Sequence, residues 1–185
     1  MGNTAAKVAT YEDLLQVPDN LVAEIIHGQL HTHPRPAPKH ARASSSLGME
    51  VGSPYDKGRG GPGGWWILDE PELHLDANVL VPDLAGWKRE RMPELPETAW
   101  FELPPDWVCE ILSPSTARLD RAEKMPLYAH HGVSHLWLVD PDLKTLEAYE
   151  LKAGQWLLLV TLDNDKPVSV KPFDEIEFPL SALWA

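Results

Sequence analysis

Two acidic side chains and one lysine near the middle of the chain have the types and spacing that metal-assisted chemistry requires. Glu110 lies in the apolar segment 108–112, and Lys124 follows in a helix-like segment. Asp83 comes directly after Pro82, at the end of an upstream strand-like run. Two carboxylates and a lysine are the minimum set for hydrolysis of a phosphodiester with the help of a metal ion. This reaction class is the working hypothesis that the residue types support.

The hypothesis gives each of these residues a role. Hard oxygen ligands suit Mg²⁺ or Mn²⁺, and carboxylates supply them. We therefore expect Asp83 and Glu110 to bind the ion, with the backbone carbonyl of Ile111 as a third ligand. Lys124 would orient or help deprotonate the attacking water and would stabilise negative charge on the phosphorane.

Three further residues could support the site. Asp120 could position either Lys124 or Arg121, and Tyr128 could hydrogen-bond a carboxylate or pack beside the lysine. Glu24 lies among apolar residues of a predicted strand. It faces solvent on the polar side of that strand, or it points inward as an accessory acid at the site.

Each candidate also has a structural explanation without chemistry. Asp83 could be a turn acid, Lys124 an ordinary surface lysine and Tyr128 a core residue. Glu110 is harder to explain in this way, because a buried lone carboxylate is costly unless it is paired or bound to metal. Cys109 should point to the opposite side of the strand from Glu110 and serve packing.

Histidines give a second, weaker metal motif. His31 and His33 alternate on one predicted strand, with His27 and His40 nearby, and two such histidines can hold a metal ion. However, three prolines within residues 34–38 predict an exposed extended loop there. We therefore expect no histidine metal site in this segment.

The elements that would position the acids and the lysine follow from the pattern around them. Residues 107–112 predict a buried strand, and residues 134–139 predict a second one. Between them, Pro126 is tolerated only in the first turn of a helix, so we expect the regular helix to begin near Glu123. Gly132 is a suitable residue to end it.

The remaining elements complete a mixed pattern of helices and strands. A short helix opens after Thr10 as its N-cap, with Leu14 and Leu15 expected to face the core. The other predicted elements are strands at 21–27, 30–33, 65–68, 72–76, 79–81, 84–87, 145–151, 155–160 and 176–178, and a helix at 39–52. This order predicts an α/β (α+β) fold with a mixed central sheet flanked by helices. We expect one domain over residues 1–185, with residues 1–9 as a loose tail.

Composition limits the classes of function. The formal net charge of -12 argues against a general nucleic-acid binder, whose affinity comes largely from phosphate neutralisation. It does not exclude a nuclease, because acids and divalent cations can act locally. Five basic residues between 35 and 59 form either a basic strip or a solvated surface: Arg35, Lys39, Arg42, Lys57 and Arg59.

Location is inferred from the same composition. The single cysteine rules out an internal disulfide and fits a reducing compartment. No apolar run approaches the roughly 20 residues needed to cross a bilayer, and residues 1–10 lack an apolar signal core. We expect a cytoplasmic protein without a membrane segment.

The motifs together resemble one known family. Val81-Pro-Asp83, Trp107-Val-Cys-Glu110-Ile-Leu-Ser-Pro-Ser-Thr116 and Asp120-Arg-x-x-Lys124-x-x-x-Tyr128-x-x-x-Gly132 closely resemble the Uma-type restriction endonuclease family of the PD-(D/E)XK nuclease superfamily. The pattern continues through Val133-Ser-His-Leu-Trp-Leu-Val-Asp-Pro141 and reaches back to Glu24-Ile-Ile-His-Gly-Gln-Leu30.

The resemblance implies a restriction-endonuclease-like core, a divalent metal (Mg²⁺ or Mn²⁺) and DNA as substrate class. Asp83 and Glu110 match the two acids of the motif, while the usual lysine position, two residues past the second acid, is Leu112. Lys124 resembles a migrated replacement, which its long flexible stem makes feasible. Glu24 resembles an additional acid near the site.

Two other functions stay open at this point. The chain could be a catalytically inactive nuclease-fold protein that serves as a binding or assembly module, or a hydrolase of a phosphoester that is not nucleic acid. A homodimer would supply the two sites that cutting both DNA strands requires, with the tryptophan-rich strands as an apolar interface.

Overall fold

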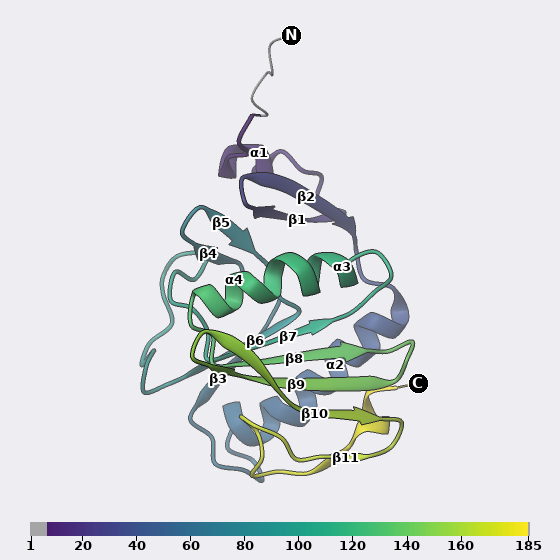
Figure 1. Ribbon diagram of the computed structural model, residues 1–185. Helices are drawn as coiled ribbons and strands as arrows, with labels where there is room; N and C mark the ends of the chain where they lie inside the picture. The colour runs from purple at the N-terminus through teal and green to yellow at the C-terminus, as the bar shows by residue number, and fades with distance from the viewer. Residues whose placement is uncertain (1–6, 185) are drawn as a thin grey trace.

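A six-stranded mixed sheet is the centre of the molecule, which a computed structural model describes over residues 7–184 (Figure 1). Its strand order is β10-β9-β8-β7-β6-β3, and only β7 and β8 are parallel. The α/β fold with a mixed central sheet is therefore confirmed. Most of the tail expected over residues 1–9 lies outside the described residues, and the single domain stays a prediction. The strands are β3 (Trp65–Asp69), β6 (Leu84–Lys88), β7 (Trp107–Ile111), β8 (His135–Asp140), β9 (Thr145–Lys152) and β10 (Gln155–Asp163).

Strand β7 is buried along its whole length, as a strand covered on both faces must be. Its side chains alternate between two separate hydrophobic clusters. Trp107, Cys109 and Ile111 belong to one cluster, and Val108 belongs to the other. Glu110 shares the face of Val108, so Cys109 points away from it, as the strand periodicity predicts.

The connection from β7 to β8 is a helical segment in three parts: α3 (Ala117–Leu119), η2 (Asp120–Lys124) and α4 (Met125–His130). The regular helix α4 begins at Met125, close to the expected start near Glu123, and Pro126 lies in its first turn as predicted. Helical structure that was not predicted precedes it from Ala117. Turn η2 is a π-helical turn in which the Met125 N–H bonds to the Asp120 carbonyl. This wider turn lies just before Pro126 and accommodates a residue that has no N–H to donate.

The helix ends where the sequence predicts. Gly132 follows the last turn with φ of +75°, a left-handed conformation that favours glycine. Its N–H bonds to the Ala129 carbonyl at 3.1 Å, and the Val133 N–H bonds to the Tyr128 carbonyl at 3.0 Å. These bonds satisfy the end of α4 and turn the chain directly into β8.

A smaller four-stranded sheet, ordered β2-β1-β5-β4, packs above this helix in Figure 1. Two of the histidines considered as ligands, His31 and His33, lie in its strand β2, which confirms the strand predicted at 30–33. His27 and Gly28 form the β1–β2 turn, both with positive φ. The strands are β1 (Leu21–Ile26), β2 (Gln29–Pro34), β4 (Leu73–Leu75) and β5 (Asn78–Leu80).

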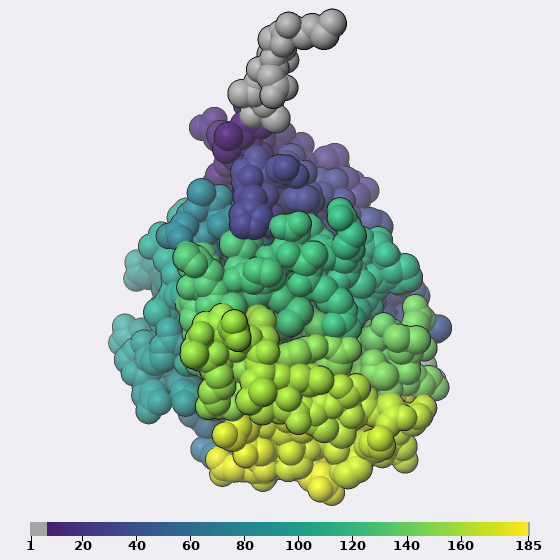
Figure 2. Space-filling model, in the orientation of Figure 1, coloured from purple at the N-terminus to yellow at the C-terminus, as the bar shows by residue number. Residues whose placement is uncertain are grey.

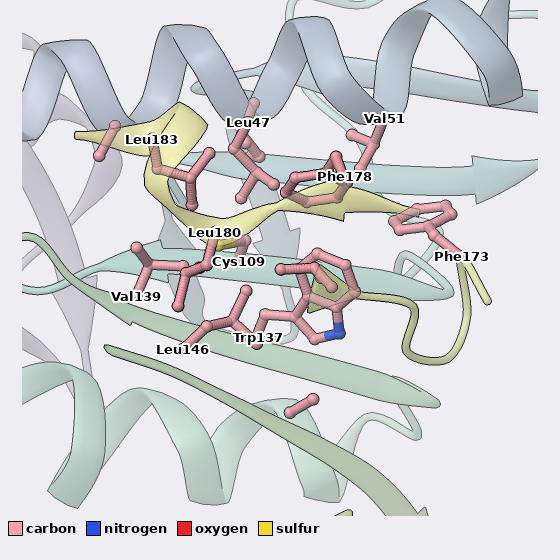
Figure 3. Close-up of a cluster of buried hydrophobic side chains, with 14 of the residues drawn as sticks. Leu47, Val51, Cys109, Trp137, Val139, Leu146, Phe173, Phe178, Leu180 and Leu183 are labelled. Carbon is pink, nitrogen blue, oxygen red and sulfur yellow. The ribbon is translucent and has the colours of Figure 1, made fainter. Parts of the chain in front are cut away.

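The opposite face of the large sheet is covered by helix α2 (Pro38–Val51) and the C-terminal segment (Figure 3). Leu47 and Val51 from the helix pack with Phe173 and Phe178 against the sheet. The other elements of this layer are η1 (Gly52–Asp56), β11 (Pro167–Val168), β12 (Phe178–Pro179) and η3 (Leu180–Leu183). Within the described residues, no helix is both long and apolar enough to cross a membrane.

The short helix α1 (Tyr11–Leu15) forms with the predicted N-cap. Thr10 and Asp13 exchange hydrogen bonds in a capping box. Leu14 is buried as expected, but Leu15 is 60% exposed, so its expected core position is wrong. Leu14 shares the inner side with Tyr11, three residues earlier, whereas Leu15 directly follows Leu14 and so points to another side of the helix.

The burial of α2 on the sheet can be tested with two substitutions in the same helix. Leu47→Ala removes a fully buried side chain and should lower the free energy of unfolding by about 2–5 kcal/mol. Met49→Ala is the matched control, because that side chain is 61% exposed and its loss should change stability by about 0.5 kcal/mol or less. Urea denaturation of both variants measures the difference, and equal effects would contradict the packing described here.

Candidate active site

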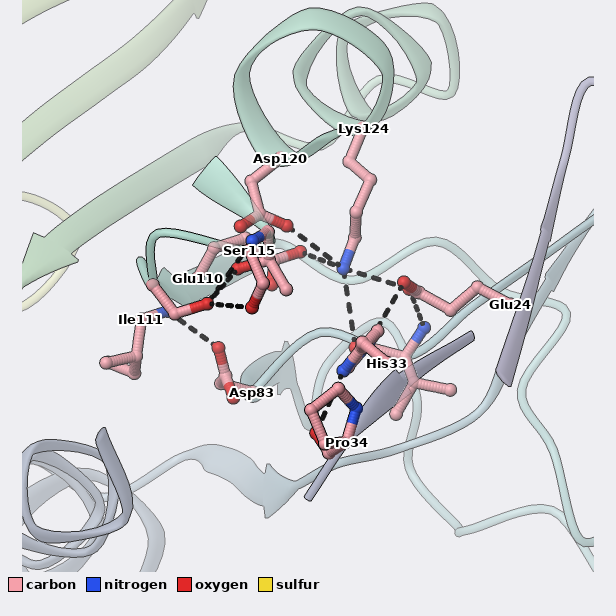
Figure 4. A network of polar contacts seen from close by, with 12 residues as sticks. Glu24, His33, Pro34, Asp83, Glu110, Ile111, Ser115, Asp120 and Lys124 are labelled. Atoms are coloured by element: carbon pink, nitrogen blue, oxygen red, sulfur yellow. Dashed lines mark hydrogen bonds and ion pairs between the residues drawn. The ribbon is translucent and has the colours of Figure 1, made fainter. Parts of the chain in front are cut away.

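A cavity of about 270 Å³ lies where the large sheet, the crossover helix and the small sheet meet. The acids and the lysine singled out from the sequence are gathered around it (Figure 4). Asp83, Glu110, Asp120 and Lys124 line the cavity directly, while Glu24 reaches the same lysine from the side. Tyr128 contacts Glu110 from the helix.

The two strand acids face each other across neighbouring strands. Strands β6 and β7 are antiparallel with Leu84 opposite Cys109, so one further step places Asp83 opposite Glu110. Asp83 Oδ2 accepts a hydrogen bond from the Ile111 N–H at 2.7 Å, which fixes the carboxylate against β7. The two carboxylates predicted from separate motifs therefore lie side by side, where strand β6 begins and strand β7 ends.

Lys124 points from η2 into this group of acids. Its Nζ lies 2.8 Å from Glu110 Oε1 and 2.9 Å from Glu24 Oε1, and it donates to the Val81 carbonyl at 3.4 Å. The side chain is only 3% exposed, which excludes the surface-lysine explanation. The structure thus brings Lys124 into contact with Glu110 and to the same cavity as Asp83, although Leu112 occupies the position two residues past Glu110.

Glu24 is buried, so its solvent-facing alternative is wrong. One carboxylate oxygen receives the Val81 N–H at 2.8 Å and the Lys124 ammonium, and the other lies 3.7 Å from His33 Nε2. Burial raises the pKa of Glu24, but Lys124, His33 and the Val81 N–H outweigh burial and lower that pKa to about 2. Glu24 is therefore an ionised acid that belongs to the site.

The two helix residues also contact the site. Asp120 Oδ1 lies 3.7 Å from Lys124 Nζ, one turn away on the same helix. Arg121 instead pairs with Glu147 at 2.8 Å, so Asp120 is oriented toward the lysine and not toward Arg121. The Tyr128 hydroxyl donates a 2.6 Å hydrogen bond to Glu110 Oε1. Tyr128 is fully buried, so it is a core residue and a partner of the acid at once.

Two histidines at the site have no assigned role in the sequence analysis. His40 Nε2, on the first turn of α2, lies 3.2 Å from Asp83 Oδ1, and His33 approaches Glu24. Burial lowers the pKa of His40, but Asp83 outweighs burial and raises it. Two of the histidines noted in the sequence therefore do lie near the site. They contact different acids because His40 lies on α2 and His33 lies on β2.

Charge at the site is unbalanced, since four carboxylates surround one ammonium. Burial raises the pKa of Glu110 well above its ordinary value, and Asp120, Asp83 and Glu24 add to this effect against Lys124. Burial also raises the pKa of Asp120. For Lys124, burial lowers the pKa, but Glu110 and Glu24 reverse the effect and raise it well above normal. The lysine stays protonated, and a further cation would relieve the remaining repulsion.

The residues present fit a hard divalent cation. Asp83 and Glu110 offer carboxylate oxygens at a cavity wall, which is the donor type that Mg²⁺ and Mn²⁺ prefer. The Ile111 N–H is committed to Asp83, and the role predicted for the Ile111 carbonyl as a ligand stays a prediction.

The basic strip considered from the sequence is mostly neutralised. Its members bind acids or backbone carbonyls: Arg35 with Glu70 at 3.8 Å, Lys39 with Asp142 at 2.9 Å, Lys57 with Asp56 at 3.1 Å and Arg42 with the Ala182 carbonyl at 3.4 Å. Arg35 also lines the cavity, so it is the member of this group that lies next to the candidate site.

A family model and a solved structure, each similar to this chain, agree with each other. The model of the Uma2 family, described as "Putative restriction endonuclease", matches residues 8–181. The crystal structure of a "putative nuclease belonging to DUF820" from Anabaena variabilis is similar with a TM-score of 0.75 and 25% sequence identity. The similarity covers 95% of this chain and 97% of that chain. No curated protein matches the chain.

The charge imbalance predicts an unusual effect of Glu110→Gln on stability. A carboxyl whose pKa is raised in the folded protein binds more protons there than in the unfolded chain, so stability falls as pH rises above about 4.5. Removing that charge should raise the free energy of unfolding at pH 7 without divalent cations, since Lys124 still pairs with Glu24. Denaturation in EDTA measures this difference.

The same experiment at pH 4 supplies the internal check, because Glu110 is then mostly protonated in both states and the advantage of glutamine should shrink. Glu97→Gln, at an exposed position, is the control and should have no effect at either pH. A Glu110→Gln variant less stable than the parent at pH 7 would contradict the proposed imbalance.

Proposed function

This chain belongs to the Uma2 family, described as "Putative restriction endonuclease", and we propose that it is a divalent-metal-dependent nuclease that hydrolyses DNA phosphodiester bonds. The observation that carries the proposal is the meeting of Asp83, Glu110 and Lys124 at one cavity. The neighbouring structure, named a putative nuclease, supports the same class of enzyme. DNA as the substrate rests on the family description.

Asp83 and Glu110, with the Ile111 carbonyl, would hold Mg²⁺ or Mn²⁺. When bound, such a cation neutralises charge on the phosphate and lowers the pKa of a bound water. Neighbouring groups hold both carboxylates in position. The Ile111 N–H and His40 orient Asp83, and Tyr128 orients Glu110 through its hydroxyl.

Lys124 supplies a fixed positive charge beside these acids. Because its raised pKa keeps it protonated, it is suited to orient a water molecule and to stabilise negative charge on the phosphorane. Glu24 and Asp120 hold the ammonium in place from opposite sides. Both are therefore positioning residues in this proposal.

One alternative has a specific observation in its favour. The formal net charge is -12, and the basic residues nearest the site are largely paired with acids. These properties suit a nuclease-fold protein that binds a partner without cutting DNA. A homodimer with two sites stays a prediction under either function.

Cleavage should be lost in variants that stay folded. We expect the purified chain to nick supercoiled plasmid DNA with Mg²⁺ or Mn²⁺, and Glu110→Gln and Asp83→Asn to lower the rate by about 100-fold or more. Since Glu110→Gln should be more stable than the parent, its loss of activity would not come from unfolding. Gel electrophoresis of the plasmid measures the rate.

Lys152→Gln is the matched control for loss of a lysine, because Lys152 is exposed and pairs with Glu150 and not with the acids of the site. Lys124→Gln should lower cleavage by a similar factor to the acid variants, while Lys152→Gln should leave it unchanged. Cleavage that survives in Glu110→Gln would reject the proposal, and absence of cleavage in the parent with both ions would favour the non-cutting alternative.

His40 should affect the affinity for the cation more than the chemical step. His40→Asn removes the contact that orients Asp83, so the Mg²⁺ concentration that gives half-maximal cleavage should rise by about 10-fold. The rate at saturating Mg²⁺ should recover most of its parent value. His27→Asn, at an exposed turn, is the control, and an unrecovered rate for His40→Asn would assign His40 a direct catalytic role.

A further inference from the structure

A second group of potential ligands lies at the far end of the crossover helix. His130 ends α4 and His131 follows it, while Asp76 lies in the turn between β4 and β5. One ligand atom from each of the three residues lies within 4.8 Å of the others. Figure 1 shows the β4–β5 hairpin beside this end of α4, and the teal and green segments meet there on the surface in Figure 2.

One atom of this group is buried without a partner. His131 Nε2 is inaccessible to solvent and makes no hydrogen bond within the described residues. Its distance of 3.7 Å to Asp76 Oδ2 is too long for a hydrogen bond. A buried polar atom left unpaired destabilises the folded protein, so this arrangement calls for a further partner between the two side chains.

We propose that Asp76, His130 and His131 form a binding site for Zn²⁺, separate from the candidate active site. Two imidazoles and one carboxylate are borderline ligands that suit zinc, whereas Mg²⁺ prefers oxygen ligands alone. Ligand atoms around one tetrahedral zinc ion lie about 3.3 Å apart, given bonds of roughly 2.0–2.1 Å. The exposed side chains of Asp76 and His130 can move inward by the small amount that this requires.

The backbone that carries these residues agrees with this assignment. His131 is at the C-terminal end of α4 and Asp76 is in the β4–β5 turn, so each ligand sits at the end of a regular element. Asp76, with φ of +55°, is held in a tight turn that directs it from the hairpin toward the helix end.

Zinc at this position would connect two elements that also serve the active site. Lys124 lies on the same helical segment, about 10 Å along its axis from His131. Strand β5 leads directly into residues 81–83 and so to Asp83. A metal ion that joins the β4–β5 turn to the end of α4 would therefore stabilise the relative position of the lysine and the strand acid.

Competition between the full-length chain and a chromophoric chelator for Zn²⁺ tests the site. The titration is made at pH 7.5 with millimolar Mg²⁺ present, so that hard ligands are occupied. We expect one tight Zn²⁺ per chain, with affinity lowered at least 10-fold by Asp76→Asn and by His130→Gln. Both residues are exposed, so these variants should stay folded. His31→Gln, on strand β2, is the matched histidine control.

The variant Glu110→Gln distinguishes this site from the proposed catalytic one, because it should retain zinc affinity while losing cleavage. Zinc should also raise the melting temperature of the parent by about 5 °C at 100 times its dissociation constant, and should not do so in His130→Gln. The proposal is overturned if the parent binds no zinc, if both ligand variants bind as the parent does, or if Glu110→Gln abolishes binding. None of these results depends on DNA cleavage.

Discussion

The buried ammonium of Lys124 is the interaction on which the rest of the site depends. It is the only cation in the described structure that contacts Glu24, Glu110 and Asp120 together, and these acids come from three different layers. A buried charge is tolerated only when it is paired and hydrogen-bonded. The small sheet, the helix and the large sheet must therefore keep their relative positions for any of these groups to stay ionised inside the protein.

Much of this arrangement could be predicted because it is local in sequence. The strand around Glu110 is uniformly apolar, and Gly132 with its positive φ marks the end of the helix. Those two limits define a strand–helix–strand crossover, and a parallel pair of strands follows from it. Asp83 lies one step beyond a predicted strand, so its approach to Glu110 needs only the antiparallel pairing of β6 and β7.

Other features depend on contacts between distant segments and could not be read from neighbours in sequence. Glu24 lies among apolar residues on a strand of which one face was expected to be polar, and only the position of Lys124 makes its burial favourable. Pro126 is expected only in the first turn of a helix, but the π-helical turn before it lets helical structure begin several residues earlier. His40 reaches Asp83 only because α2 crosses the opposite face of the sheet.

The acidity of the chain and a reaction on a phosphodiester are compatible once charge is considered locally. A substrate phosphate near four carboxylates would be repelled by them, and one lysine cannot neutralise that group. A divalent cation held by Asp83 and Glu110 would offset most of this local negative charge, since such an ion is often the largest charge in its site. Burial and the neighbouring acids raise the pKa of Glu110, and a cation bound at this carboxylate would counter that effect. The excess of carboxylates over cations at the site should thus lower the stability of the folded protein without metal. The same excess would attract a metal ion and, with it, a phosphate.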